Sequence, residues 1–167
     1  MTDTFVTTAA GTVGTVNLRR ARERDRDFLI GVYASTREEL GLLDWADGPR
    51  QAFIATQFAA REQQYRQLNP TASVQVIEVG RRPAGRLYID RRPVEIRIID
   101  IALLPQFRGA GVGGYLLARL IEEAFTSERT LSIHVEPDNR SAGLYSRMGF
   151  VTVAEHGRYH RMEWRAA

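Results

Sequence analysis

The segment QFRGAGVGGYLL, residues 106–117, constrains the fold of this chain more than any other. It places Gly109, Gly111 and Gly114 in a G-x-G-x-x-G pattern, after a run of strand character and before a run of helical periodicity. Glycine allows a backbone turn to approach a ligand closely, and the amides at a helix N-terminus bind anions. The segment therefore predicts a strand-to-helix turn that holds a phosphate group.

Composition limits the chemistry that such a turn can serve. All 23 basic residues are arginines, and without a lysine the chain cannot form the GxxxxGK[ST] loop of P-loop nucleotide hydrolases. Cysteine is absent, which excludes disulfides, thiolate nucleophiles and cysteine-ligated metals. His156 and His160 lie in a predicted hairpin instead of on a helix, so we expect no metal.

Length and charge indicate one globular domain. The 167 residues are 44% hydrophobic, and the net charge of +3 comes from scattered arginines, so we expect no nucleic-acid partner. The N-terminus lacks both regions of a signal peptide and no apolar run could span a membrane, which predicts a cytoplasmic protein without membrane association. We expect a flexible tail over residues 1–14 and a single domain over 15–167.

Hydrophobic periodicity predicts an α/β chain. Helical spacing is found over residues 25–40, 49–68, 112–125 and 140–148. Strand patterns are found over residues 15–21, 73–80, 84–90, 94–104, 131–137, 150–156 and 158–164. The three consecutive strands before the glycine segment are separated by short turns, which predicts an antiparallel meander.

A dinucleotide-binding fold is one alternative for the glycine pattern, since Glu136 ends the next predicted strand, where a ribose-binding carboxylate would lie. That fold needs further parallel strands, whereas only a short helix and a hairpin follow Glu136. Arg108 also stands beside the turn and suits a pyrophosphate. A turn without any ligand is the other alternative, although glycines at a helix start cost stability without a packing return.

Two segments of the chain resemble those of one known family. Residues 106–111, Gln-Phe-Arg-Gly-Ala-Gly, match the Q/R-x-x-G-x-G/A signature of the GNAT N-acetyltransferase superfamily. Residues 144–150, Leu-Tyr-Ser-Arg-Met-Gly-Phe, are similar to the family's L-Y-x-x-x-G-F segment and follow in the family's order. The resemblance implies an α/β fold whose mixed central sheet begins with an antiparallel meander and is flanked by helices.

The resemblance also implies acetyl-CoA as co-substrate. In this family the pantetheine arm pairs with the strand before the signature, and the amides of the signature hold the pyrophosphate. Asn139 is similar to an asparagine that touches the CoA arm. The cofactor-binding residues that the resemblance implies are Ile101, Ala102, Leu103, Gln106, Arg108, Gly109, Ala110, Gly111, Val112, Gly113, Asn139 and Tyr145.

The implied reaction is direct attack of a primary amine on the thioester in a ternary complex, which needs a proton acceptor and a proton donor. Tyr145 stands where the family's usual general acid stands, and its alternative is a core tyrosine. We favour Glu95 as the base from its spacing to Gln106, with Asp100 as the other candidate on the opposite face of a regular strand. A β-bulge would swap the two, and a water relay is also open.

In this family the acceptor binds over the two N-terminal helices and their loop. We expect Arg37, Glu38 and Trp45 to contact it, because carboxylates and an aromatic wall suit a cationic amine; their alternative is ordinary solvated side chains. Small-molecule and peptide amines both stay open as substrates, and a homodimer as a partner. Two other functions stay open: a non-catalytic acyl-CoA-binding regulatory module and, less favoured, a nicotinamide-dependent oxidoreductase.

Overall fold

The computed structural model describes residues 5–7, 13–37, 46–136, 139 and 141–167. The described strands are β1 (Phe5–Thr7), β2 (Val13–Arg20), β3 (Ser73–Val79), β4 (Arg82–Arg91), β5 (Glu95–Leu103), β6 (Thr130–Val135), β7 (Val151–His156) and β8 (Tyr159–Trp164). The described helices are α1 (Arg26–Ser35), α2 (Asp47–Leu68), α3 (Val112–Thr126) and α4 (Ala142–Arg147), with 3₁₀ turns η1 (Glu23–Asp25) and η3 (Pro105–Phe107).

These strands form one sheet of eight in the order β1-β2-β3-β4-β5-β6-β8-β7. β1 to β5 pair antiparallel, β5 pairs parallel with β6, and β8 and β7 complete the sheet antiparallel. α3 provides the crossover between the two parallel strands, as a parallel pair requires. The mixed sheet with an antiparallel meander that the sequence predicts is therefore confirmed.

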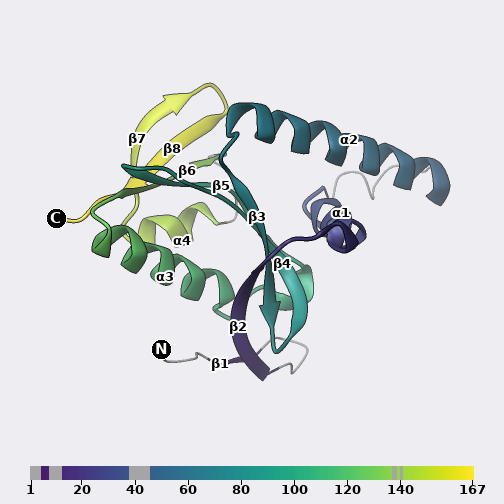
Figure 1. Cartoon of the computed structure of the whole chain (residues 1–167), viewed down its shortest axis with the longest axis horizontal. Coiled ribbons are helices and arrows are strands. Elements are labelled where there is room, and N and C mark those ends of the chain that lie inside the picture. The colour runs from purple at the N-terminus through teal and green to yellow at the C-terminus, as the bar shows by residue number, and fades with distance from the viewer. Residues whose placement is uncertain (1–4, 8–12, 38–45, 137–138, 140) are drawn as a thin grey trace.

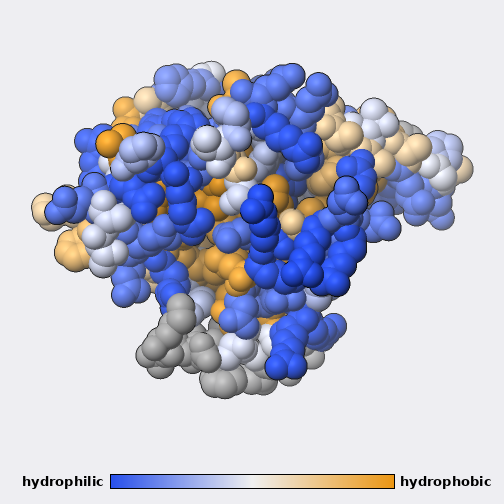
Figure 2. All heavy atoms as spheres, viewed as in Figure 1, coloured by the Kyte–Doolittle hydropathy of each residue, from blue (hydrophilic) through white to orange (hydrophobic). Residues whose placement is uncertain are grey.

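Helices cover both faces of the sheet, α1 and α2 on one and α3 and α4 on the other (Figure 1). The larger core lies under α3, whose inward residues Leu116, Leu117 and Leu120 pack on strand residues such as Ile96 and Ile98. A smaller core between α1, α2 and the sheet is formed by Leu29, Tyr33, Ile54 and Phe58. Hydrophilic residues cover most of the face in Figure 2, with hydrophobic ones between them near the centre.

The N-terminal segment, for which the composition predicts a flexible tail, contains one described strand. Phe5–Thr7 pairs with residues 13–15 as an antiparallel hairpin, and the remainder of residues 1–12 lies outside the described ranges. Strand pairing uses backbone N–H and C=O groups, so a segment rich in threonine, alanine and glycine can also form it. Gly14 also has a packing reason, since a Cβ there would meet the Gly80 Cα at 2.5 Å.

Helix boundaries also differ slightly from the prediction. α1 ends at Ser35, where the side chains of Ser35 and Thr36 donate to carbonyls three residues earlier and compete with the helix. α2 begins at Asp47, two residues before the predicted start. No helix within the described ranges is long and apolar enough to cross a membrane.

Candidate active site

β5 and β6 diverge partway along the sheet. They pair from Glu95–Thr130 to Ile98–Ile133, and within the described ranges no strand pairs with residues 99–103 on this side. The other edge of the same segment remains paired with β4. The open edge leaves backbone donors and acceptors that an extended ligand can pair with in the manner of an added strand.

A β-bulge at Ile99 decides which side chains face this opening. Asp100 lies opposite Tyr88 whereas Ile98 lies opposite Ile89, so β5 carries one extra residue there. An extra residue reverses the alternation of side chains beyond it. The β5 side chains in or against the larger core are accordingly Ile96, Ile98, Ile101 and Leu103. Asp100 is thereby turned to the sheet face that α1 and α2 cover.

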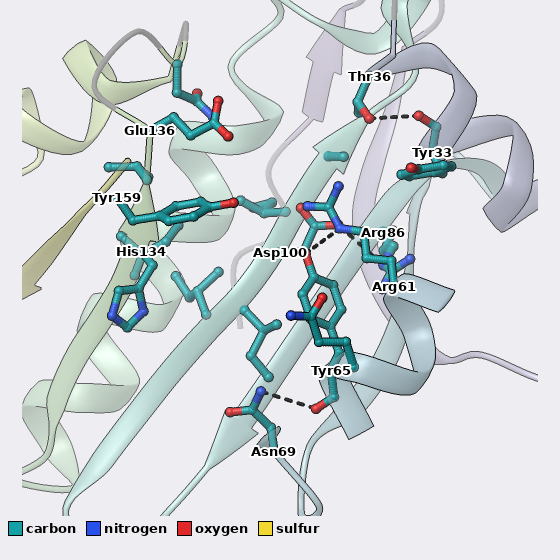
Figure 3. Close-up of a pocket in the computed structure, with 18 of the residues that line it drawn as sticks. Tyr33, Thr36, Arg61, Tyr65, Asn69, Arg86, Asp100, His134, Glu136 and Tyr159 are labelled. Atoms are coloured by element: carbon teal, nitrogen blue, oxygen red, sulfur yellow. Dashed lines mark hydrogen bonds and ion pairs between the residues drawn. The ribbon is translucent and has the colours of Figure 1, made fainter. Parts of the chain in front are cut away.

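A cleft of about 1200 Å³ lies at the divergence. On the side of α1 and α2 Figure 3 labels Tyr33, Thr36, Arg61, Tyr65, Asn69 and, from β4, Arg86; on the opposite side it labels His134, Glu136 and Tyr159. Asp100 lies between these two walls. Ile101 and Ala102, predicted to border the pantetheine arm, also line the cleft.

Asp100 has one buried cation beneath it. The Arg86 side chain is 3% exposed, and its Nε lies 3.5 Å from Asp100 Oδ2 without forming a hydrogen bond. Arg86 Nη2 donates to Glu62 on α2 instead. The Asp100 side chain is 26% exposed, so its carboxylate remains accessible from the cleft as a hydrogen-bond acceptor.

Glu95, the base favoured from the sequence, lies where β5 and β6 are still paired and does not line the cleft. Its carboxylate accepts hydrogen bonds from Ser132, Arg161 and Arg97. Burial by itself raises the pKa of Glu95, but these hydrogen bonds and the two arginine charges outweigh it and lower the pKa to about 2. A carboxylate of this kind is a weak proton acceptor near neutral pH.

Tyr145 belongs to α4, on the other face of the sheet, yet it borders the cleft because the sheet is open there. The residue is 3% exposed, and its ring lies 5.8 Å from that of Phe150. Burial, and then the charge of Asp100, raise the pKa of the Tyr145 hydroxyl, while a hydrogen bond with Ser141 lowers it less. The hydroxyl therefore stays protonated near neutral pH and can act as a donor.

The glycine segment forms the predicted strand-to-helix turn. Gly109 and Gly111 have φ of 73° and 85°, in the left-handed region, and a Cβ at either position would meet no atom within 4 Å. Among the described residues no backbone carbonyl accepts a hydrogen bond from the amides of residues 109–114. A turn with open space and unpaired amides at the start of α3 fits a pyrophosphate.

Arg108 connects this turn to two other elements. Its Nε donates to the Leu103 carbonyl at 2.9 Å, and its Nη2 lies 3.4 Å from the Ser35 carbonyl at the end of α1. Gln106 is exposed beside it, and the buried Phe107 anchors η3 in the larger core. The turn is therefore fixed to β5, which leads from the cleft into it.

Of the remaining predicted site residues, two line the cleft and two lie outside the described residues. Asn139 lines the cleft, and its Oδ1 accepts from the Ser141 amide at 2.7 Å. Arg37 lines the cleft and donates to Tyr33 Oη and Gln57 Oε1 at 2.8 and 2.9 Å. Glu38 and Trp45 lie outside the described residues.

The sequence analysis did not predict that Arg61 and Tyr65 of α2 and Arg86 of β4 would line the cleft near Asp100. On α2, Arg61 and Tyr65 are four residues apart and so share one helix face. That spacing was the available signal, but arginine and tyrosine at such a spacing are common on solvated helices. The placement of Arg86 has no local signal, because it depends on strand pairing.

Comparison with known proteins gives one family and a shared fold. The sequence profile of the acetyltransferase (GNAT) family matches residues 38–150, more than half of the chain. No protein in a search of curated sequences matches significantly.

Several solved structures share the fold at low identity. The PaiA N-acetyltransferase of Thermoplasma acidophilum, in complex with coenzyme A, is 14% identical with a TM-score of 0.66 over 91% of this chain and 99% of its own. An acetyltransferase of Thermus thermophilus is 18% identical with a TM-score of 0.66 over 91% and 97%. RimJ of Mycobacterium smegmatis, in complex with CoA-disulfide, is 18% identical with a TM-score of 0.65 over 98% and 87%.

Proposed function

Because this chain belongs to the acetyltransferase (GNAT) family, we propose that it transfers an acetyl group from acetyl-CoA to a primary amine by direct attack in a ternary complex. One observation carries the proposal. Among the described residues nothing pairs with the edge of β5 that leads from the cleft with Asp100 and Tyr145, or with the amides of the turn that follows it. The backbone groups along β5 suit the extended arm of a thioester, and the amides of the turn suit a pyrophosphate at the end of that arm.

Acetyl-CoA supplies the activated acetyl group as a thioester. The amides of Gly109, Ala110, Gly111, Val112 and Gly113 would hold its pyrophosphate, with the help of the helix dipole of α3. Arg108 would brace the turn and add positive charge, since its guanidinium already bonds the end of β5. Ile101, Ala102 and Leu103 would pair with the pantetheine arm, and Gln106 and Asn139 would border it.

Asp100 is the proton acceptor that the geometry supports, in preference to Glu95. Its carboxylate is open to the cleft, whereas Glu95 accepts from three side chains and does not line it. Asp100 would bind the acceptor as an ammonium ion and take one proton from it, directly or through water. The neutral amine is then the nucleophile.

Tyr145 is the proposed proton donor. The amine nitrogen forms a bond to the carbonyl carbon, the carbon–sulfur bond breaks, and the Tyr145 proton passes to the sulfur of the leaving group. An ammonium on Asp100 offsets the carboxylate charge that helps to raise the pKa of Tyr145, so the bound acceptor makes the donor more acidic. The nitrogen loses its second proton as the amide forms, and this proton restores Tyr145, directly or through water. The proton held by Asp100 returns to solvent.

The first test is ligand stabilisation of the native state. Acetyl-CoA and CoA should raise Tm, whereas NADH and NADPH should not, because a bound ligand adds RT ln(1 + [L]/Kd) to the free energy of unfolding. A screen of amines for acetyl-CoA-dependent thiol release follows. Binding of acetyl-CoA without thiol release from any amine would assign a non-catalytic acyl-CoA module, and stabilisation by NADH alone would assign a nicotinamide enzyme.

A further inference from the structure

The α2 side of the cleft holds a cation that forms no ion pair with any described residue. Arg61 lines the cleft, and in the described part of the chain no carboxylate lies within ion-pair distance of its guanidinium. Two other cleft arginines differ from it: Arg86 pairs with Glu62 and Asp100, and Arg97 pairs with Glu95.

Aromatic contacts hold Arg61 in one position. Its guanidinium lies 5.6 Å from the Tyr33 ring centroid and 5.2 Å from that of Tyr65. Its Nε donates to Tyr65 Oη at 2.5 Å, so this N–H of the guanidinium is not available to a ligand. The two terminal nitrogens donate to no acceptor in the described part of the chain, and their geometry suits a carboxylate.

Arg61 and Asp100 face the same space with opposite charges. Burial lowers the pKa of the Arg61 guanidinium, but the charge of Asp100 and the contacts with Tyr65 and Tyr33 together outweigh it and raise that pKa. Arg61 and Asp100 therefore interact without forming an ion pair. A site with a carboxylate and a fixed guanidinium apart from each other is complementary to a molecule that carries an ammonium and a carboxylate.

Resting on the proposed function, we infer that the acceptor is an amine that carries a carboxylate, with its ammonium on Asp100 and its carboxylate on Arg61. A neutral or purely cationic amine leaves the Arg61 charge desolvated and unpaired, which costs affinity. Arg158 lines the opposite wall, but it is exposed in the turn between β7 and β8 and no described contact fixes it.

The test compares matched pairs of acceptors. Each pair consists of an α-amino acid and its primary amide, with thiol-release rates corrected for the fraction of neutral amine. Dipeptides and their amides form a second arm, which separates a free amino acid from a peptide as the source of the carboxylate. We expect kcat/KM for the acid to exceed that for the amide by about 10- to 100-fold in at least one arm, the range of a charge-assisted hydrogen bond.

Arg61→Met should remove this preference. The variant keeps an unbranched apolar stem beside the two rings and removes the charge that an amide leaves unpaired. The kcat/KM for the acids should therefore fall, whereas that for the amides should not fall and the acetyl-CoA Kd should be retained. Arg61→Lys should recover part of the preference, because it restores the charge without the fork. Arg50→Met is the matched control, since Arg50 lies on the same helix and does not line the cleft.

The outcomes separate the two proposals. Thiol release at equal rates from acids and amides, or an Arg61→Met variant that loses both equally, overturns the carboxylate site and leaves the acetyltransferase proposal intact. An absence of thiol release from every amine, with acetyl-CoA still bound, overturns the acetyltransferase proposal itself.

Discussion

Arg86 Nε lies 3.5 Å from the Asp100 carboxylate and donates no hydrogen bond to it, although the arginine is almost fully buried. The guanidinium is held instead from its other side by Glu62, and by the rings of Phe58, Tyr65 and Tyr88 around it. Asp100 thus keeps its lone pairs for a ligand while a cation beneath it compensates its charge.

Breaking the Arg86–Glu62 pair should be costly, because both residues are buried. We expect Arg86→Met to lower the free energy of unfolding by about 3–5 kcal/mol, since Glu62 would keep an uncompensated buried charge. The double variant Arg86→Met/Glu62→Met should recover most of this loss. Denaturant unfolding of the four proteins measures the coupling, and a double variant as unstable as the sum of the singles would contradict it.

The glycine turn predicts a loss of acetyl-CoA affinity in Gly111→Val. Valine at φ 85° is strained by about 1–2 kcal/mol and its side chain would enter the space proposed for the pyrophosphate. The Kd of acetyl-CoA should rise at least about tenfold by calorimetry, the equivalent of one lost hydrogen bond to a charged group. Gly157→Val is the matched control, because Gly157 also has positive φ and open space but lies in the β7–β8 turn. Equal loss of affinity in both would indicate general strain.

Asp100→Asn and Glu95→Gln should affect activity differently. Asp100→Asn removes the proposed proton acceptor and should lower kcat/KM by about 10²–10⁴-fold, most strongly at low pH where the amine arrives protonated. Glu95→Gln should change kcat/KM much less. The reverse order would assign the base to Glu95, and small effects in both would assign it to water.

Glu95 should instead affect stability at acid pH. Its pKa of about 2 in the native state lies below the ordinary 4.5, so the unfolded state binds more protons between these values. The stabilisation from Glu95 is therefore fully present above about pH 4.5 and is lost as the pH falls through 2. The Tm of Glu95→Gln should depend less on pH in this window. Asp25, whose pKa is also lowered to about 2 by Arg19, should retain its own share of the dependence.

Tyr145→Phe tests the proton donor. It keeps the ring and removes the hydroxyl, so kcat should fall by about 10²–10⁴-fold with the acetyl-CoA Kd unchanged. An acyl donor with a more acidic thiol should recover part of the loss. Because the pKa of Tyr145 is raised, the wild-type rate should show no fall from its ionisation at moderately alkaline pH. Tyr115→Phe, on α3 and outside the cleft, is the control; equal activity in both variants would make Tyr145 a packing residue.

Local patterns in the sequence determined the element order, the antiparallel meander and the position of the glycine turn, whereas the mixed sheet was implied by the family resemblance. These features depend on hydrophobic periodicity and on residues such as Gly109 and Gly111 that are adjacent in the chain. The two family segments further indicated which strand and which short helix border the site, since their order along the chain is the order of the fold.

Only the tertiary structure decided which side chains meet in the cleft. The bulge at Ile99 depends on the register between β4 and β5, and it turns Asp100 toward α2. Glu95 accepts a hydrogen bond from Arg161, 66 residues away along the chain, and does not line the cleft. Arg61 faces Asp100 only because α2 packs on the sheet. Such contacts depend on packing between residues that are far apart in the chain, so they cannot be predicted from any short segment of the sequence.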